Sequence, residues 1–160
     1  MFKKILVAVD GSTYSRNALP AAVEVAKKFG GEIYVLHVAE HDKGRAATYS
    51  LESPADATRL VADAVKTAED AGVKAAGEVR DAAAQHSAQV IVQTASARGM
   101  DLIVMGSRGL SDVQGLFLGS VTHKVIQSGE IPVLVVRATA KETATAPVAV
   151  PAPAVKALAY

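Results

Sequence analysis

The sequence predicts an α/β domain: a parallel sheet that carries helices on both faces. Apolar runs that end in turn residues alternate five times along the chain with segments whose apolar residues recur at helical spacing. These runs lack the polar alternation of a strand with one solvated face, which indicates strands buried on both sides. Right-handed crossovers leave few topologies for such strands.

The first half of the chain supplies three of the expected strands. Asp10, Gly11 and Ser12 end the first apolar run, and Pro20 should kink the following helix or shift its start. Ser53 resembles the N-cap of a second helix, with proline at the next position. The connection over 41–54 has no readable shape. The expected elements are strands at 5–9, 32–38 and 73–79, with helices that stop at Gly30 and Gly72.

In the second half, the pattern predicts the secondary structure except over 81–89, where it does not distinguish a helix from a loop. Val90, Ile91, Thr94 and Ala95 predict a helix that closes at Gly99. Further strands are expected at 101–105 and 131–136, with a helix at 120–128 between them. Residues 1–137 are therefore one domain, and the Ala/Pro/Val-rich residues 138–160 are expected to be a flexible tail.

Composition excludes several classes of protein. The chain has 160 residues, 50% of them hydrophobic and 21% charged, which is typical of a soluble globular domain. The absence of cysteine excludes disulfide scaffolds and thiolate metal sites. A net charge of +1 without a basic cluster argues against nucleic acid as a partner. No stretch approaches the ~20 apolar residues that span a membrane, so no membrane partner and a cytoplasmic location are expected.

The segment from Gly106 to Ser120 is the candidate ligand site. A Gly-Ser-Arg-Gly sequence follows the fourth strand directly. Nine residues then separate Gly109 from Gly119, which precedes a helix start. Glycines let backbone N–H groups approach phosphate oxygens, and a helix N-terminus adds unpaired donors. Ser120 could add a hydroxyl group, and Ser107 or Arg108 could reach the outer phosphates. The same glycines could equally serve only as turns.

Other sites of chemistry are less well supported. Asp10 has two readings, as a partner of ribose hydroxyls or as the cap of the next helix. The four histidines fall on separate elements without metal-site spacing, so no metal ligand and no catalytic residue is assigned. Neither a P-loop nor a G-x-G-x-x-G motif occurs. Without the P-loop lysine, rapid phosphoryl transfer lacks its usual charge stabilisation, so slow hydrolysis at most is expected.

The sequence resembles the universal stress protein family over residues 2–137. The resemblance is carried by KKILVAVDGSTYSRNAL, YVLHV, DLIVMGSRG and the segment GSRGLSDVQGLFLGSVTHKVI followed by IPVLVV. The spacing Gly-two-Gly-nine-Gly-Ser is similar to the ATP-binding signature of that family. The chain departs from the family pattern within 81–87, where AAAQHS stands in place of a Gly-Asp-Pro type turn, so the start of the third helix stays open.

The resemblance implies an open five-stranded sheet of order 3-2-1-4-5, an adenine nucleotide alpha hydrolase-like fold. It implies that Asp10 contacts ribose and that the backbone of Val38 meets adenine. The expected ligand is ATP, with or without Mg²⁺, and ADP and AMP are alternatives. Arg108 is also expected in the site, because its long side chain can reach the outer phosphates. The resemblance places the phosphates on Gly106, Gly109, Gly119, Ser120 and Val121, with Met105 lining the site.

The leading hypothesis for function is a stress-response sensor or regulator that binds ATP and acts on an unknown protein partner. The resemblance implies a homodimer that pairs along the strand from Ile131 to Val136, since an apolar edge strand needs a partner. Two alternatives stay open. One is a slow ATPase or a nucleotidyl-transferring relative, and the other is an interaction module with a vestigial nucleotide site.

Overall fold

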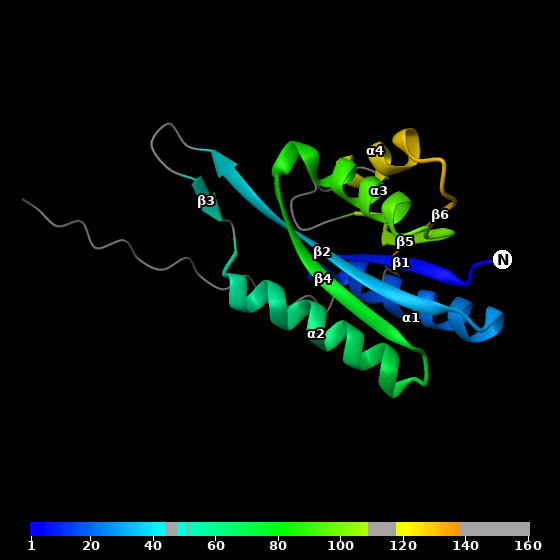
Figure 1. Cartoon of the computed structure of the whole chain (residues 1–160). Coiled ribbons are helices and arrows are strands. Elements are labelled where there is room, and N and C mark those ends of the chain that lie inside the picture. Colours follow the sequence, from blue (N-terminus) through cyan, green and yellow to red (C-terminus); the bar gives the residue numbers. More distant parts are fainter. Residues whose placement is uncertain (44–47, 51, 109–117, 138–160) are drawn as a thin grey trace, which may run out of the picture.

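Five parallel strands form the sheet at the centre of the molecule (Figure 1). The structure is a computed structural model that describes residues 1–43, 48–50, 52–108 and 118–137. In chain order the parallel strands are β1 (Lys4–Val9), β2 (Glu32–Lys43), β4 (Ala75–Ala83), β5 (Leu102–Gly106) and β6 (Val133–Val136). They pair in the order β4-β2-β1-β5-β6, so the predicted order 3-2-1-4-5 is confirmed.

Two helices cover each face of this sheet, as predicted (Figure 1). Helices α1 (Thr13–Phe29) and α2 (Pro54–Asp70) pack on one face. Helices α3 (Ser87–Ala97) and α4 (Ser120–Ser128) pack on the other. The Ser53 side chain accepts from the N–H of Asp56 and Gly30 takes a left-handed φ of 59°, so the predicted start of α2 and end of α1 are confirmed.

Strand β1 connects the two packed layers. Ile5 and Val7 point to the α1 and α2 side, whereas Leu6 points to the α3 and α4 side, and all three are 0% exposed. Strands β2 and β5 lie on either side of it and continue the same alternation. Because both faces are buried, the strands need no polar alternation, which explains the continuous apolar runs.

The structure differs from the sequence prediction mainly around the third strand. Strand β2 continues to Lys43 rather than stopping at residue 38, and β3 (Thr48–Ser50), which was not predicted, pairs antiparallel with its end. Strand β4 covers Ala75–Ala83 instead of 73–79, because pairing with β2 outweighs the low β-propensity of its alanine and charged residues. A short 3₁₀ turn (Ala84–His86) then leads into α3 at Ser87.

Two proline positions also refine the prediction. Helix α1 runs from residue 13 to residue 29 with Pro20 inside it, so the proline does not shift the start of the helix. Strand β6 begins at Val133 rather than residue 131, because Pro132 has no N–H to donate to a strand ladder.

The predicted tail, residues 138–160, lies outside the described residues. None of the helices in the described ranges has both the length and the apolarity to cross a membrane.

The doubly packed sheet predicts a large difference between buried and exposed apolar side chains. Ile103 on β5 is 0% exposed, whereas Ile126 on α4 is 44% exposed. We expect Ile103→Ala to lower the free energy of unfolding by about 2–5 kcal/mol, because it removes packed atoms and leaves a cavity. Ile126→Ala is the matched control and should cost less than about 1 kcal/mol. Urea denaturation followed by circular dichroism measures both, and equal losses would contradict the assignment of the core.

Candidate functional site

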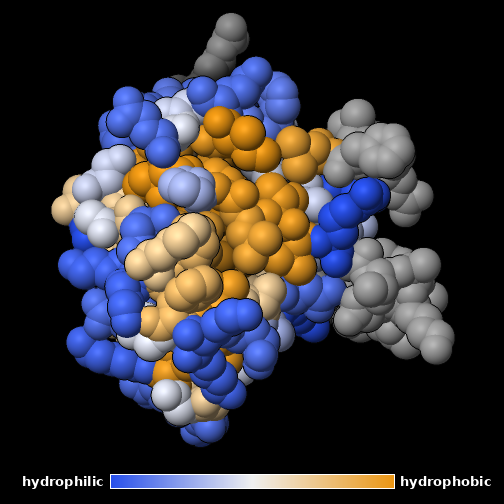
Figure 2. All heavy atoms as spheres, turned by 90° about the vertical axis from the view of Figure 1, so that its right-hand side faces the viewer, coloured by the Kyte–Doolittle hydropathy of each residue, from blue (hydrophilic) through white to orange (hydrophobic). Residues whose placement is uncertain are grey.

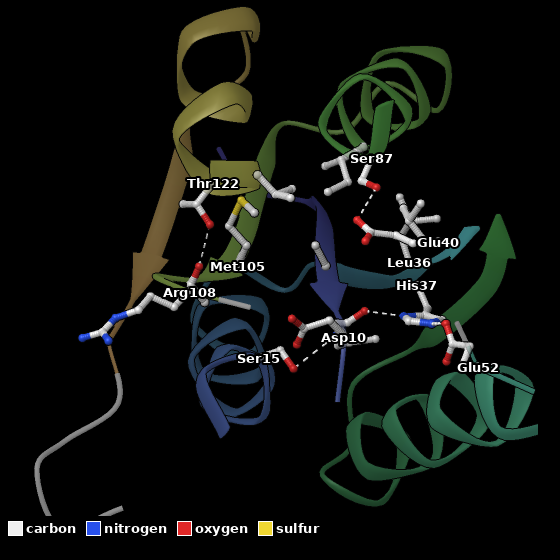
Figure 3. A pocket seen from close by; sticks show the side chains of 16 residues that line it. Asp10, Ser15, Leu36, His37, Glu40, Glu52, Ser87, Met105, Arg108 and Thr122 are labelled. Atoms are coloured by element: carbon white, nitrogen blue, oxygen red, sulfur yellow. Dashed lines mark hydrogen bonds and ion pairs between the residues drawn. The ribbon is translucent and has the colours of Figure 1, made fainter. Parts of the chain in front are cut away.

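A cavity of about 270 Å³ opens at the carboxyl ends of β1, β2 and β5 (Figure 3). The chain leaves β1 toward β2 on one side and leaves β5 toward β6 on the other, so the strand order reverses here. Open α/β sheets bind their ligands at this point, outside the carboxyl ends of the strands. Residues of α1, α3 and α4 complete the walls. The topology therefore places the cavity where a ligand is expected.

One half of the cavity is apolar. Side chains from two strands and two helices form it: Leu36 and Val38 from β2, Met105 from β5, Ile91 from α3 and Val121 from α4. They belong to, or pack against, the core cluster on the α3 and α4 face of the sheet. A planar apolar group, such as an aromatic base, could be sandwiched between these side chains.

The edge of β2 borders this half of the cavity. Strand β1 pairs with β2 only as far as His37, and β3 pairs with it only from His41 on the same side. Glu32 donates to the Lys3 carbonyl of the β1 side, so alternate residues from Glu32 onward turn their backbone groups that way. Val38 and Glu40 belong to this set. The last pair of β1 with β2, Val9 with His37, uses the Val38 N–H, which leaves the Val38 carbonyl and the Glu40 N–H where none of the described strands pairs with this edge. Backbone donors and acceptors can therefore serve a ligand there.

Asp10 stands at the end of β1 on the cavity wall. Its Oδ1 accepts from the N–H of Ser12 at 2.9 Å, which shapes the turn into α1. The cap of α1 is Ser12, whose hydroxyl oxygen accepts from the N–H of Ser15 at 3.1 Å. The capping reading of Asp10 is therefore wrong, since Ser12 has that role, and the half-buried carboxyl group of Asp10 contributes to the cavity instead.

His37 and Glu52 form the wall beside Asp10 (Figure 3). The imidazole is 3% exposed, with Nδ1 at 2.7 Å from the Val9 carbonyl oxygen and Nε2 at 2.5 Å from Glu52 Oε1. A carbonyl oxygen only accepts, so Nδ1 must carry a proton and donate it. The contact with Glu52 then needs a second proton, carried either by Nε2 or by the carboxyl group. His37 thereby ties Glu52, two positions before the start of α2, to the end of β1.

Glu40 and Ser87 form a second polar pair on the opposite wall. The Ser87 hydroxyl donates to Glu40 Oε1 at 2.6 Å, and Ser87 itself is 3% exposed. Figure 3 shows the Glu40 carboxyl group pointing from β2 toward the centre of the cavity, below α3. The apolar half of the cavity thus ends in a carboxylate that a buried hydroxyl group holds in place.

The two ends of the glycine segment meet at α4. Gly119 donates its N–H to the Ser107 carbonyl at 2.7 Å, and the Thr122 hydroxyl donates to the Gly106 carbonyl at 2.9 Å. The Gly119 N–H is therefore used within the protein, and backbone donors for a ligand must come from the rest of the first turn of α4. A Cβ on Gly106 would lie 2.7–2.9 Å from atoms of Tyr14, so this glycine also permits close packing of α1 on β5.

Arg108 lines the cavity but does not aim its charge into it. Its guanidinium carbon lies 5.1 Å from the ring centroid of Tyr14, within the range of a cation–π contact. In Figure 3 the guanidinium group points away from Asp10 and Met105. A contact with an outer phosphate would therefore require the Arg108 side chain to turn. Gly109, the next predicted site residue, lies outside the described residues.

The structure brings most of the predicted site residues together. Asp10, Val38, Met105, Gly106, Arg108 and Val121 line the cavity, whereas Gly119 and Ser120 lie at the start of α4, next to the lining residues. The sequence prediction missed the polar lining residues Ser15, His37, Glu40, Glu52, Ser87 and Thr122. The alternation of β2 beyond Val38 could have found Glu40. No signal could have found Glu52, because the connection before α2 had no readable pattern.

The close approach of Gly106 to Tyr14 predicts that this glycine is needed for stability before any ligand binds. We expect Gly106→Ala to lower the free energy of unfolding by about 1–3 kcal/mol, because the new methyl group meets backbone atoms of α1. Met105→Leu, a volume-conserving change at the adjacent position, should cost less than about 1.5 kcal/mol. Chemical denaturation without nucleotide compares them, and a Gly106→Ala protein of unchanged stability would contradict the packing role.

Comparison with known proteins places this site in a family. The model of the universal stress protein family matches residues 1–137. Universal stress protein YxiE of Bacillus subtilis is 36% identical over 156 residues, covering 86% of this chain and all of the relative. Universal stress protein MJ0531 of Methanocaldococcus jannaschii is 34% identical over 149 residues, covering 89% of this chain and 86% of the relative.

Solved structures agree with the sequence comparison. The structure of the protein MJ0577 superposes with a TM-score of 0.73 at 28% identity, covering 87% of this chain and 98% of that one. The universal stress protein from Archaeoglobus fulgidus in complex with dAMP gives a TM-score of 0.64 at 24% identity, over 85% of this chain and 99% of that one, which shows the shared fold. On the strength of the family match and these relatives, the chain belongs to the universal stress protein family.

Proposed function

We propose that this protein binds ATP in the cavity at the carboxyl ends of β1, β2 and β5 and acts as a nucleotide-dependent regulator. The observation that carries the proposal is the combination of an apolar slot with a strand edge open to it at Val38. The slot accepts a base, and the strand edge offers backbone groups to the polar rim of that base. Family membership supports the link to a stress response.

The cavity fits the nucleoside part of ATP best. A volume of about 270 Å³ is slightly below the ~300 Å³ at which typical small-molecule sites begin. The base lies between Val38, Met105 and Val121, and the ribose hydroxyls reach the Asp10 carboxylate. The phosphates then extend toward Gly106, Gly109, Gly119 and Ser120, where the first turn of α4 supplies N–H donors and the positive end of a helix dipole.

The wider set of structures supports an adenine nucleotide as the ligand. The Archaeoglobus fulgidus protein with this fold holds dAMP, which consists of adenine, a sugar and a single phosphate. The choice of ATP over AMP or ADP rests on the length of the glycine segment, which can serve several phosphates, with Mg²⁺ accompanying them. Without a P-loop lysine to stabilise phosphoryl transfer, the protein holds ATP rather than rapidly hydrolysing it. A cytoplasmic location, where ATP is plentiful, suits this role.

Titration with ATP tests the proposal through Asp10. Asp10→Asn keeps the oxygen that accepts from Ser12 but removes the charge, so the fold should persist. We expect ATP to bind about tenfold more weakly to Asp10→Asn, and more weakly still to Asp10→Ala, because a hydrogen bond to a charged group is worth about 1.5–3 kcal/mol. Isothermal titration calorimetry measures the dissociation constants.

Asp101→Asn is the matched control for this titration. Asp101 accepts from the backbone of Lys3 and Lys4 at the amino ends of the strands, away from the cavity, so its variant should bind ATP like the wild type. Wild-type protein that shows no saturable ATP binding below millimolar concentration would refute the proposal. Asp10 variants with unchanged affinity would remove Asp10 from the site.

We propose further that the protein acts as a homodimer along β6, the edge strand that ends the sheet. Strand β6 pairs only with β5 among the described strands, and Leu134 on it is 37% exposed. Figure 2 shows a continuous apolar area on the side of the molecule where β6 and α4 lie. Exposed apolar areas and open strand edges both favour association with another chain. The unknown protein partner would then bind to a dimer.

A charge on β6 tests the dimer. We expect wild-type protein to sediment as a dimer at micromolar concentration and Leu134→Lys to sediment as a monomer, because a lysine on an edge strand opposes pairing. Ala76→Lys is the matched control, since Ala76 is an exposed residue of β4, the strand at the opposite edge of the sheet. Sedimentation velocity distinguishes the species. A wild-type monomer, or a dimer that survives Leu134→Lys, would contradict pairing along β6.

A further inference from the structure

The unusual group in the cavity is the Glu40 carboxylate. It borders the apolar half of the cavity, which Leu36, Val38 and Ile91 help to line, and an ionised carboxyl group loses part of its hydration there (Figure 3). Its hydrogen bond from Ser87 is the interaction that the described residues provide, and none of the ion pairs among them includes Glu40. One more donor would offset the lost hydration.

The position of Glu40 relative to Val38 indicates where that donor belongs. The two residues lie two positions apart on β2, so their side chains share a face and their Cα atoms are roughly 7 Å apart. If the nitrogen-bearing edge of a purine contacts the backbone at Val38, the substituent at position 6 of that purine lies toward Glu40. Ser87 holds the carboxylate at this place through a bond of 2.6 Å.

We propose that Glu40 selects the base, by accepting a hydrogen bond from the exocyclic amino group of adenine. A carboxylate only accepts, so it attracts the 6-amino group of adenine and repels the 6-oxo group of hypoxanthine or guanine. Ser87 is a positioning residue that keeps Glu40 in the conformation needed for this contact. The inference rests on the nucleotide site proposed above and assigns its choice of base to one side chain.

Binding of ATP and of inosine triphosphate (ITP) tests this role, because the two share the ribose and the phosphates and differ at the base. Wild-type protein should bind ATP at least about tenfold more tightly than ITP, which corresponds to a hydrogen bond with a charged group. In Glu40→Gln the side-chain amide can donate to a 6-oxo group. ATP affinity should therefore fall, ITP affinity should rise, and the ratio between them should shrink by about tenfold or more.

Ser87 and Glu32 supply the companion variants. Ser87→Ala should reduce the ATP-to-ITP ratio by a few fold because Glu40 loses its anchor, and Ser87→Thr, which keeps a hydroxyl group, should restore it. Glu32→Gln is the matched control on the same strand. Glu32 pairs with Lys74 at the amino end of β2, outside the cavity, so this variant should leave both affinities unchanged.

The outcomes separate this inference from the proposed function. If wild-type protein binds ATP but Glu40→Gln keeps the wild-type ratio, Glu40 does not read the base, and the ATP site still stands. If wild-type protein binds neither nucleotide, both proposals are wrong. A folded Glu40→Gln protein that loses ATP and ITP equally would also overturn the selective role. Should Glu40→Gln fail to fold, an unchanged ratio in Ser87→Ala would overturn it in the same way.

Discussion

Burial of β1 on both faces is the constraint on which the rest of the structure depends. The strand has a neighbour on each edge and a helical layer on each side, so every residue from Ile5 to Val7 is removed from water. Burial on both faces requires apolar side chains along the middle of the strand, and here the strand runs parallel to both neighbours and ends where polar residues begin. That end is Asp10, and the strand order reverses beside it. The location of the cavity follows from the same packing that stabilises the fold.

Two hydrogen-bonded pairs then give the cavity its polar character. His37 with Glu52 fixes the α2 side, and Ser87 with Glu40 fixes the α3 side. Each pair joins β2 to a residue at or near the start of a helix. The polar groups of the site are therefore held by contacts between elements far apart in the sequence. This arrangement preorganises the walls, so that less conformational freedom is lost when a ligand enters.

Much of this fold could be predicted from the sequence because its central strands carry the signal locally. Ile5 to Val9 and the run before Gly106 are apolar without interruption, and Ser53 and Gly30 mark helix ends through their own capping chemistry. Strands β3 and β4 lack such a signal. Their residues become strands because β2 offers a partner, and pairing between distant segments leaves little trace in local composition.

The candidate site divides in the same way. Asp10 and the glycines could be found because turn chemistry and helix starts are local features. Glu40 could have been predicted as well, since it shares a face of β2 with Val38, but the strand was expected to end at residue 38. Glu52 and Ser87 reach the cavity only through tertiary packing. The role of Gly106 in the contact with Tyr14 likewise became visible only when α1 was placed against β5.

The extension of β2 past the end of β1 has a consequence for how this site can evolve. Positions 38 and 40 lie on a strand that β4 already supports along its other edge, up to the pair of His41 with Ala83. Val38 also packs against the core cluster on the α3 and α4 face, whereas Glu40 borders the cavity and belongs to neither core cluster, so substitutions at position 40 are separated from the requirements of the core. At this position of β2, beyond the end of β1, ligand preference can therefore change during evolution while the stability of the fold is kept.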